Sequence, residues 1–579
     1  MFEMKKKYLL LCPFCLLLQM VLSAQKYDYQ WILPASANEP SNVLDFNFFP
    51  PKIKEKVLNL QFGISNTSAC DPETGELQFY SNAWQIFNKS AALMSNGDNI
   101  DSWAGMALNM ITLPSPENEN KYYIFHLKTN PIPTVYSYLN PEILYTLVDM
   151  QLDAGNGGIV YKNQPFLSTL WSFSNSMDAT KHANGRDWWL LAPEWRSTKY
   201  HRWLLTPEGI KDTAVQEMNY PLIDSLNRTG WNTFSPDGSL YVDFDIHNGI
   251  RIFDFDRCTG HLGALTLLPS PDTASGPGPG VVFSPNSRFL YIIYRYAIFQ
   301  YDLWADDIAA SMDTVAVWDG VIDVHTLAST FYTPERGPDG KIYISSGQLR
   351  DYLHVIKYPN KKGSACGVVQ RGLQFPHRFS VAMPKFPNFR LGPLDGSACD
   401  TLGLDNHPMA GFTWEVVDSL QPLLVEFTDN SFYEPAQWFW DFGGTGTSTG
   451  TNPLHAFPTD GTYTVCLTVS NQYANDTFCR EVTVGTVSVK ETEGRQPFAL
   501  YPNPASDAVL LRLNPETGTD LRQVRIFAVS GQQVFASTLP PGSGELRISV
   551  ANWPEGMYIA KTMTADGPLS RTFVVHHRR

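Results

Sequence analysis

A short unit of turn, strand, turn and strand recurs along the first two thirds of this 579-residue chain and limits the folds open to it. Its clearest copy, residues 233–260, reads TFSPDGSLYVDFDIHNGIRIFDFDRCTG. Pro-Asp-Gly and Asn-Gly favour turns, and the segments between them alternate apolar and polar residues, as strands with one buried face do. The unit therefore predicts hairpins of antiparallel sheets.

Related turns, each followed by an apolar strand, occur at six places within about residues 27–395 and begin near Asp71, Ser115, Ala183, Ser235, Ser284 and Gly337. In the last three copies the prolines Pro236, Pro285 and Pro338 are 49 and 53 residues apart, the length of a four-stranded propeller blade. One twisted sheet cannot bury both faces by itself, whereas radially stacked sheets bury them against each other. We therefore expect residues 25–395 to form a β-propeller.

The number of blades depends on how the ring closes. Strands near residues 29–33 and 44–48 and the apolar stretch 379–389 are available for closure, which gives six or seven blades, with seven favoured. A row of separate sandwiches is the alternative, but the repeat is too short for independent sandwich domains. Aromatic residues make up 13% and charged residues 17% of the chain, with 41 Gly and 41 Pro, which favours a turn-rich all-β protein.

The charge of the chain excludes one class of partner. The net charge is -14, and no cluster of Lys and Arg follows the N-terminus. Nucleic-acid binding needs such clusters to neutralise phosphates, so no nucleic-acid partner is expected.

The N-terminal segment predicts export. Three lysines, residues 5–7, precede an apolar run over 8–22, and Ser23-Ala24 supplies the small residues of a signal-peptidase site. We expect residues 1–24 to be a signal peptide cleaved between Ala24 and Gln25. The run is short and interrupted by Pro13, which argues against a membrane anchor, and no later segment is apolar enough to span a bilayer.

Six of the eight cysteines follow the predicted cleavage site: Cys70, Cys258, Cys366, Cys399, Cys466 and Cys479. An even number in an exported chain without CxxC spacing favours disulfides over metal ligation. We predict a disulfide between Cys366 and Cys399, and leave Cys70 and Cys258 unassigned.

Longer stretches of the repeat region resemble a known family. Residues 75–97, 120–127, 144–163, 181–195 and 336–345 resemble the secreted WD-like propellers that occur in type IX secretion cargo. The resemblance implies a fold and a compartment but no activity, because propellers host unrelated functions.

Residues 405–487 look like a PKD domain, an immunoglobulin-like sandwich, through LLVEFTDNS, WFWDFGG and GTYTVCLTVSN. Apolar and polar residues alternate in these segments, as expected for half-buried strands. The family pattern WDFGDG reads WDFGGT at 440–445, and the missing Asp removes an oxygen ligand, so no calcium site is expected there. The domain would serve as a spacer or as a weak glycan or protein contact.

The last hairpin of this domain permits a sharper prediction. Cys466 and Cys479 are symmetric about the turn at Gln472-Tyr473, on the face opposite the apolar side chains of both strands. Directly opposed residues of an antiparallel pair are close enough to bridge, so we predict a Cys466–Cys479 disulfide on the outward face.

A polar linker, residues 488–496, leads to a C-terminal module, residues 497–579, which is similar to the type A sorting domain of the type IX secretion system. The features that carry this likeness are, in order, Tyr501, Pro502, Asn503, Pro504, Gly531, Gly556 and Tyr558. The resemblance implies a small β-sandwich that engages the type IX machinery as its partner, and a protein released from the cell or attached to its surface after crossing the periplasm. The alternative is a final adhesive domain.

No catalytic motif, such as HExxH, GxSxG or a phosphate-binding loop, occurs in the chain, and we predict no catalytic, cofactor-binding or metal-binding residues. His182 belongs to a blade motif, so a structural role is favoured. The acid pairs Asp243 with Asp245 and Asp254 with Asp256 each share one face of a strand, where solvated acids at a loop edge are favoured over catalytic ones.

Two functions remain open. The favoured hypothesis is a secreted or cell-surface binding and adhesion protein that is not an enzyme and uses the propeller as a platform for a protein or glycan ligand. The alternative is a secreted glycan-active hydrolase with carboxylates about 5–10 Å apart near the propeller channel. The features that distinguish this protein are expected in its nonrepeating connections, residues 129–138, 163–183 and 304–331.

Overall fold

The computed structural model describes residues 25–34, 39–58, 66–102, 110–128, 142–165, 177–194, 197–221, 230–245, 248–271, 280–322, 328–379, 383–417, 421–485, 498–513, 523–528, 533–538, 545–564 and 567–577. The predicted signal peptide with Ala24, the linker 488–496, Gly531 and the insertion 129–138 lie outside these residues. Within the described residues the elements are strands and two short 3₁₀ helices, and no helix is long and apolar enough to cross a bilayer.

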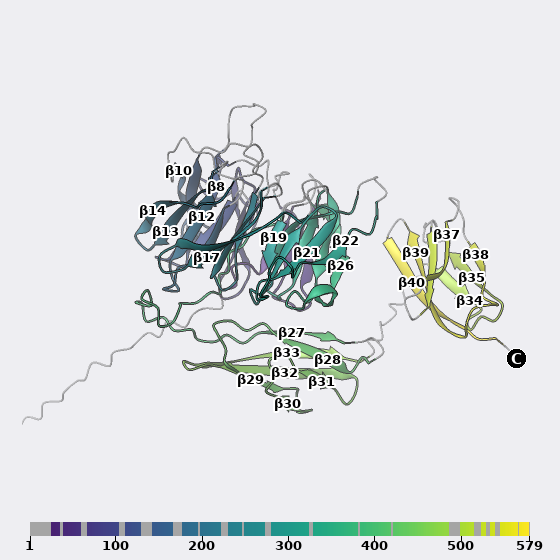
Figure 1. The fold of residues 1–579 in the computed structure, drawn as a ribbon. Coiled ribbons are helices and arrows are strands. Elements are labelled where there is room, and N and C mark those ends of the chain that lie inside the picture. Colours follow the sequence, from purple (N-terminus) through teal and green to yellow (C-terminus); the bar gives the residue numbers. More distant parts are fainter. Residues whose placement is uncertain are drawn as a thin grey trace, which may run out of the picture. The chain divides into compact units, whose positions relative to one another are not determined.

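In the described part of residues 30–379 the strands form seven antiparallel sheets, each made of strands that follow one another along the chain. Two sheets have three strands: β1 (Gln30–Leu33), β2 (Ser41–Asp45) and β3 (Lys52–Lys56); then β4 (Thr67–Cys70), β5 (Leu77–Ser81) and β6 (Ile86–Asn88). Figure 1 shows sheets of this region standing side by side, coloured from purple to teal.

The other five sheets have four strands each. They are β7 (Met110–Pro114), β8 (Lys121–Leu127), β9 (Ile143–Asp149) and β10 (Gly158–Pro165); β11 (Asp178–Lys181), β12 (Trp188–Pro193), β13 (Lys199–Thr206) and β14 (Gly209–Glu217); β15 (Gly230–Phe234), β16 (Leu240–Asp245), β17 (Gly249–Asp256) and β18 (His261–Leu268); β19 (Gly280–Phe283), β20 (Phe289–Ile293), β21 (Ala297–Asp302) and β22 (Asp313–Val317); and β23 (Phe331–Arg336), β24 (Ile342–Ser346), β25 (Arg350–Ile356) and β26 (Val368–Phe379).

The sheets are arranged radially, as in a propeller. The first strand of one sheet contacts the first strand of the next, as in β11 with β15, β15 with β19 and β19 with β23. The hydrophobic clusters combine side chains of neighbouring sheets, and one cluster joins Trp31 and Leu44 of the first sheet to Leu353 and Phe375 of the last. The ring therefore closes by packing of the first sheet on the last, and the predicted propeller fold is confirmed.

The repeated Ser-Pro-Asp-Gly turn has a local physical cause. Asp237 Oδ1 accepts the Ser239 amide at 3.0 Å, and the Leu240 amide donates to Ser235 Oγ at 2.9 Å. Gly238 has φ +71°, and a Cβ there would lie 2.9 Å from Thr180 Oγ1 of the preceding sheet. Glycine is needed both for the left-handed backbone and for this close approach between sheets.

The PKD region forms two facing sheets, as a sandwich requires. One contains β27 (Phe412–Val416), β28 (Leu424–Asp429) and β31 (Leu454–Ala456); the other contains β30 (Thr447–Ser448), β29 (Gln437–Asp441), β32 (Gly461–Ser470) and β33 (Asn475–Val484). Trp440, Val465 and Leu467 are fully buried between the sheets, in agreement with the predicted alternation.

The Cys466–Cys479 disulfide is present, between residues that are direct partners in the β32–β33 pair, with Cα atoms 4.1 Å apart. The predicted Cys366–Cys399 disulfide is wrong. Cys399 is bonded to Cys258, and Cys366 is a free thiol buried in the core between the last two propeller sheets. Sequence spacing could not reveal this, because the segment after the propeller returns to a turn 141 residues earlier in the chain.

The segment that connects the propeller to the PKD domain is held against the propeller. Arg257 Nη2 donates to the Gly392 carbonyl at 2.5 Å, and the Leu394 amide donates to the Ala183 carbonyl at 2.8 Å. The Cys258–Cys399 disulfide adds a covalent link in the same segment. The connection is therefore part of the folded structure and not a free linker.

Residues 486–579 form a separate compact unit. Its sheets are β34 (Phe498–Tyr501), β35 (Ala508–Leu513) and β38 (Glu545–Ser549); and β37 (Gln533–Thr538), β36 (Gln523–Ala528), β39 (Gly556–Thr564) and β40 (Gly567–Val575). Asn503 Oδ1 accepts the Val574 amide at 2.8 Å, and the buried Tyr558 donates its hydroxyl to the Pro554 carbonyl at 2.7 Å. These two motif residues therefore have structural contacts in the small sandwich.

Candidate functional site

A small cavity lies between the first strands of four propeller sheets, β11, β15, β19 and β23, where the propeller channel is expected. Residues 385–388 of the returning chain form its remaining wall. Lys385 Nζ donates to the Met177 and Asn232 carbonyls, each at 2.9 Å, and lies 3.8 Å from Asp178 Oδ1. The chain thus places its own ammonium group in the channel.

The carboxyl groups of this cavity are engaged in the fold. Asp178 accepts the Ala179 amide at 2.8 Å and the Phe234 amide at 3.0 Å. Burial raises the pKa of Asp178, against the opposing charge of Lys385, and burial raises the pKa of Glu335 well above its usual value, against the opposing charge of Arg336. The cavity volume is about 40 Å³, which is room for about three water molecules and not for a sugar ring.

A larger cleft lies where the propeller meets the PKD domain, and we call it the junction cleft. Its walls come from three places: Phe49 in the β2–β3 turn, residues 339–341 and 357–361 in two turns of the last propeller sheet, and strands β27 and β28 with Asn452 of the PKD domain. Its volume is about 190 Å³. Three aromatic rings line it, those of Phe49, Tyr358 and Trp414.

Ion pairs and hydrogen bonds connect the two sides of the junction cleft. Lys357 Nζ lies 2.8 Å from Glu415 Oε1, and the Tyr358 hydroxyl donates to Glu415 Oε2 at 2.6 Å. Partial burial acts to raise the pKa of Glu415, but the hydrogen bonds from Lys357 and Tyr358 outweigh it and lower that pKa. A second ion pair joins Lys361 to Glu426 at 3.0 Å, so the PKD domain is fixed against the propeller here.

The aromatic wall is surrounded by cations. The Phe49 and Trp414 ring centroids are 4.6 Å apart, and the Arg480 guanidinium lies 5.4 Å from the Phe49 centroid. Lys341 Nζ lies 5.7 Å from the same centroid, and among the described residues it has no ion-pair partner. A cation is attracted to the face of an aromatic ring, and the Lys341 charge also acts on the nearby carboxyl groups of Asp339 and Glu415.

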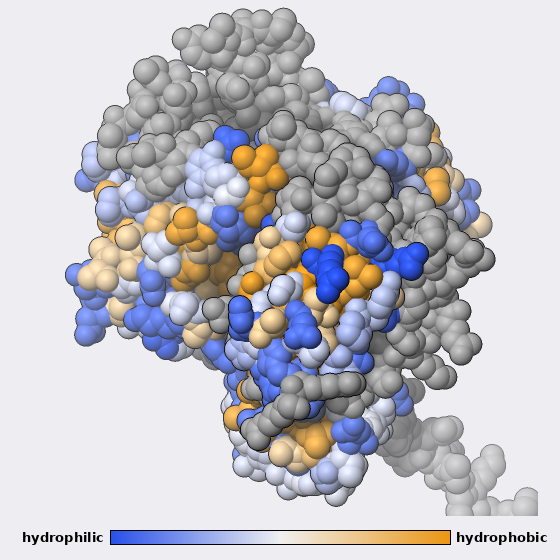
Figure 2. Space-filling model, turned by 90° about the vertical axis from the view of Figure 1, so that its right-hand side faces the viewer, coloured by the Kyte–Doolittle hydropathy of each residue, from blue (hydrophilic) through white to orange (hydrophobic). Residues whose placement is uncertain are grey.

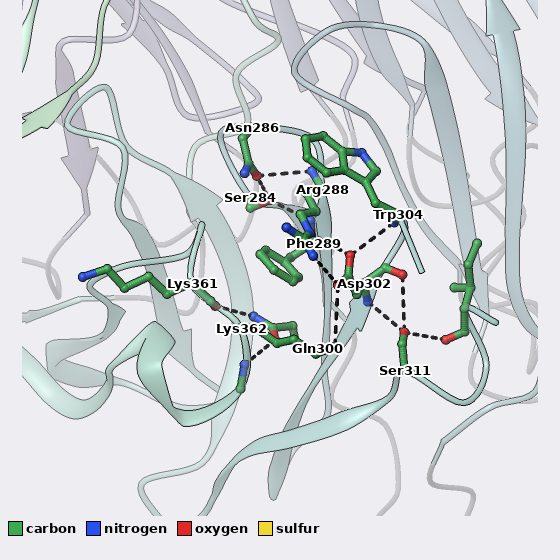
Figure 3. Close-up of polar contacts among 12 residues, drawn as sticks. Ser284, Asn286, Arg288, Phe289, Gln300, Asp302, Trp304, Ser311, Lys361 and Lys362 are labelled. Atoms are coloured by element: carbon green, nitrogen blue, oxygen red, sulfur yellow. Dashed lines mark hydrogen bonds and ion pairs between the residues drawn. The ribbon is translucent and has the colours of Figure 1, made fainter. Parts of the chain in front are cut away.

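A polar network of the β19–β22 sheet lies next to this cleft. Figure 3 shows Asp302 accepting two hydrogen bonds from Arg288, at 2.8 and 2.7 Å, with Trp304 beside them. Trp304 is 67% exposed, and its ring centroid is 5.1 Å from the Arg288 guanidinium. Gln300 donates to the Lys361 carbonyl at 2.9 Å, while the Lys361 side chain points away from the network (Figure 3).

The side chains considered as chemical candidates have structural partners. His182 Nδ1 accepts the Asn184 amide, and its Nε2 donates to the Cys258 carbonyl, so the favoured structural role fits its contacts. The expectation of solvated acids is wrong for Asp243 and Asp245, which are fully buried; Asp243 forms an ion pair with the buried Arg251 of the next strand at 3.1 Å.

Asp254 and Asp256 are exposed, as expected. Asp441 of the altered PKD motif accepts the Gly444 amide at 3.0 Å, and the described residues hold no group of three or more His, Cys, Asp or Glu that could bind a metal. Of the three nonrepeating connections, the described part of 304–331 contains Trp304, whereas 129–138 and 166–176 lie outside the described residues.

The junction cleft was missed at the level of sequence. The sequence does contain a feature that could have predicted a role for Phe49. In the run FNFFPPK an aromatic pair precedes two prolines, which indicates a turn, and an aromatic residue in a turn is not expected to pack in the core of a blade. No pattern links that turn to Trp414 in the PKD domain.

Comparison with family models places two domains. A PKD domain matches residues 408–486, and a secretion system C-terminal sorting domain matches residues 499–576. The chain is therefore secreted cargo. The sorting domain is of the type IX kind, and it directs the chain through the periplasm to the cell surface or the outside. Comparison with curated proteins gave no match.

Solved structures similar to this chain include the PKD1 domain of Vibrio anguillarum Epp, with 30% identity over 14% of this chain and 93% of that chain, at a TM-score of 0.13. A putative 6-phosphogluconolactonase from Bacteroides uniformis has 12% identity over 62% of this chain and 98% of its own, at a TM-score of 0.38. The Dos1 propeller has 10% identity over 54% and 73%, at a TM-score of 0.29. At such identities the likeness of the propellers concerns the fold and transfers no activity.

Proposed function

We propose that this protein is a secreted or cell-surface binding protein whose ligand occupies the junction cleft. The observation that carries this proposal is the contrast between the two hollows. The channel cavity has about 40 Å³ and is lined by the chain's own Lys385, whereas the junction cleft has about 190 Å³ and three aromatic rings in its walls. Binding sites combine apolar walls with a few placed polar groups, as this cleft does.

The PKD domain contributes to the site as a rigid wall. The Lys357–Glu415 and Lys361–Glu426 pairs and the hydrogen bond from Asn430 to the Asp339 carbonyl, at 2.9 Å, position β27 and β28 against the last propeller sheet. Preorganised walls reduce the entropy that binding costs. Figure 2 shows hydrophobic patches among hydrophilic residues in the coloured part of one face.

A glycan-active hydrolase is the second candidate, because the carboxyl groups of Asp178 and Glu335 line the channel cavity and both have raised pKa values, but the cavity of about 40 Å³ would have to widen before a sugar ring could enter. A protonated and an ionised carboxyl group are the pair that glycoside hydrolysis needs. Under this hypothesis Glu335→Gln abolishes release of reducing sugar from a glycan mixture. An active Glu335→Gln variant excludes it.

The test of the binding function is affinity capture with the full-length protein, from extracellular extracts and on a glycan array. The proposal predicts at least one ligand whose binding weakens about tenfold or more in Trp414→Ala, since buried aromatic anchors dominate binding energy. Trp84→Ala is the matched control, because Trp84 is 41% exposed and lies outside the cleft. Equal binding by Trp414→Ala and the unchanged protein, with both folded, contradicts the proposal.

A further inference from the structure

We infer that Arg480 is the centre of an oxyanion-binding site at the boundary between the propeller and the PKD domain, which takes a carboxylate or phosphate group. Arg480 lies against the rings of Phe49 and Trp414 but is not among the residues that line the junction cleft. The inference is therefore independent of the ligand that the cleft takes. Three observations carry it: the register of Arg480, the rings around its guanidinium, and the charges that act on it.

Arg480 occupies a strand position where an apolar residue is expected. In β33 it is the direct partner of Val465 in β32, which is fully buried in the core of the PKD domain. Phe478 and Val482, which share its face of the strand, also pack in or against that core. The half-buried guanidinium lies beside the edge strand β27, 6.0 Å from the Trp414 ring centroid. Strand alternation thus directs this cation away from the outward face of the sheet.

Three aromatic rings surround the guanidinium. Besides Trp414, the Phe478 centroid lies 5.1 Å away and the Phe49 centroid 5.4 Å away. Phe49 belongs to the propeller and the other two rings to the PKD domain, so both domains hold the same cation. A guanidinium that stacks on aromatic faces keeps its fork of N–H donors in a fixed orientation, ready to bind a carboxylate or phosphate group.

These donors have no acceptor in the part of the chain that the structure describes. Within it the Arg480 guanidinium forms no hydrogen bond and no ion pair, and partial burial lowers its pKa, opposed only by Tyr29. A partly buried charge without a paired carboxylate is costly. An oxyanion can accept two parallel N–H bonds from one guanidinium, which compensates that cost.

A second cation lies close to Arg480. Burial lowers the pKa of Lys26, the Arg480 charge lowers it further, and Asp71 acts in the opposite direction. The Asp71 carboxylate also accepts the Thr74 amide at 2.8 Å in its own turn, and the Lys26 amide donates to the Pro72 carbonyl at 2.9 Å. An oxyanion at Arg480 reduces the repulsion between the two cations, so both side chains favour its binding.

The experiment is measurement of nuclear magnetic resonance line broadening of inorganic phosphate and of labelled acetate by the full-length protein, at constant ionic strength. We expect saturable binding of at least one anion with a Kd of about 10 mM or below. Arg480→Gln should weaken it about tenfold, and so should Arg480→Met, which keeps contact with the rings but has no donors. Arg480→Lys should retain part of the affinity. Arg295→Gln is the matched control, because Arg295 stacks on one propeller ring, 5.5 Å from the Tyr296 centroid.

The inference is overturned if neither anion binds in this range, or if Arg480→Gln and Arg480→Met are folded and bind as the unchanged protein does. An equal loss in Arg295→Gln overturns it as well, since any stacked arginine would then suffice. Binding of phosphate alone supports a phosphate ligand, and binding of acetate alone supports a carboxylate. Ligand capture that depends on Trp414 is measured separately, so the proposed function and this inference can fail independently.

Discussion

At the scale of single residues, the cysteines show which disulfides can be predicted from local sequence and which cannot. Cys466 and Cys479 are partners within one hairpin, so alternation and symmetry about the turn were enough to pair them. Cys258 and Cys399 meet only because the chain folds back on the propeller, and this information is not local.

Thiol labelling tests this assignment. In the exported chain, alkylation of the native protein should modify no cysteine rapidly, because Cys70 and Cys366 are buried thiols. Burial raises the pKa of the Cys366 thiol to about 11, which further lowers its reactivity. Denaturation without reductant should expose two thiols, and reduction should expose all six. Mass spectrometry that finds Cys366 in a disulfide contradicts the assignment.

Buried histidines make the propeller sensitive to acid. His126 is fully buried, with its ring nitrogens 3.1 Å from the Asp101 carbonyl and from Thr146 Oγ1, and burial lowers its pKa to about 4. The unfolded chain therefore binds this proton at a higher pH than the folded one. The free energy of unfolding should fall by about 3 kcal/mol as pH drops from about 6.5 to about 4.

Denaturant titrations at pH 7, 5.5 and 4.5 measure this dependence. Replacement of His126 by Gln, which cannot be protonated, should reduce the loss on acidification, whereas His261→Gln at an exposed position should not. Identical pH profiles for the His126 variant and the unchanged protein would show that this imidazole does not set the acid sensitivity.

At the scale of elements, the innermost strands of neighbouring sheets approach closely. A Cβ on Gly280 of β19 would lie 2.9 Å from the Tyr332 carbonyl and closer still to the Pro334 ring of β23. Backbone cannot move aside without separating the two sheets, so Gly280→Ala should destabilise the propeller by about 1–3 kcal/mol. Denaturant unfolding measures this effect, with Gly450→Ala as a control, since a Cβ on Gly450 would make only an ordinary contact, 3.6 Å from Ser448 Oγ. Equal stability of Gly280→Ala and the unchanged protein contradicts the described approach.

Strands and turns could be predicted because their causes are local. The Ser-Pro-Asp-Gly turn makes its hydrogen bonds within five residues, and strand alternation follows the buried face. Asp243 and Arg251 form a buried ion pair on adjacent strands of one hairpin. The alternation of apolar and polar residues did not predict that the polar face of these strands is also buried. The junction cleft could not be predicted, because it needs a turn at Phe49, another at Lys357 and a strand at Trp414 to meet.

At the scale of the whole molecule, the sorting domain determines destination. Since residues 499–576 match a secretion system C-terminal sorting domain, deletion of residues 497–579 should trap the protein in the periplasm. Cell fractionation and surface labelling measure this outcome, with deletion of the PKD region as a comparison that keeps the sorting domain. Unchanged surface display after loss of residues 497–579 would falsify the dependence on this domain.

We propose that ligands of this protein bind where the propeller meets the PKD domain and not in the channel. Hydrogen exchange of the full-length protein, with and without a captured ligand, tests it most directly, because bound ligand slows exchange of the amides it covers. We expect slower exchange in residues 339–341, 357–361 and 413–416, with residues 178–181 and 332–336 unchanged. Protection confined to the channel strands, with none at the junction cleft, would contradict it.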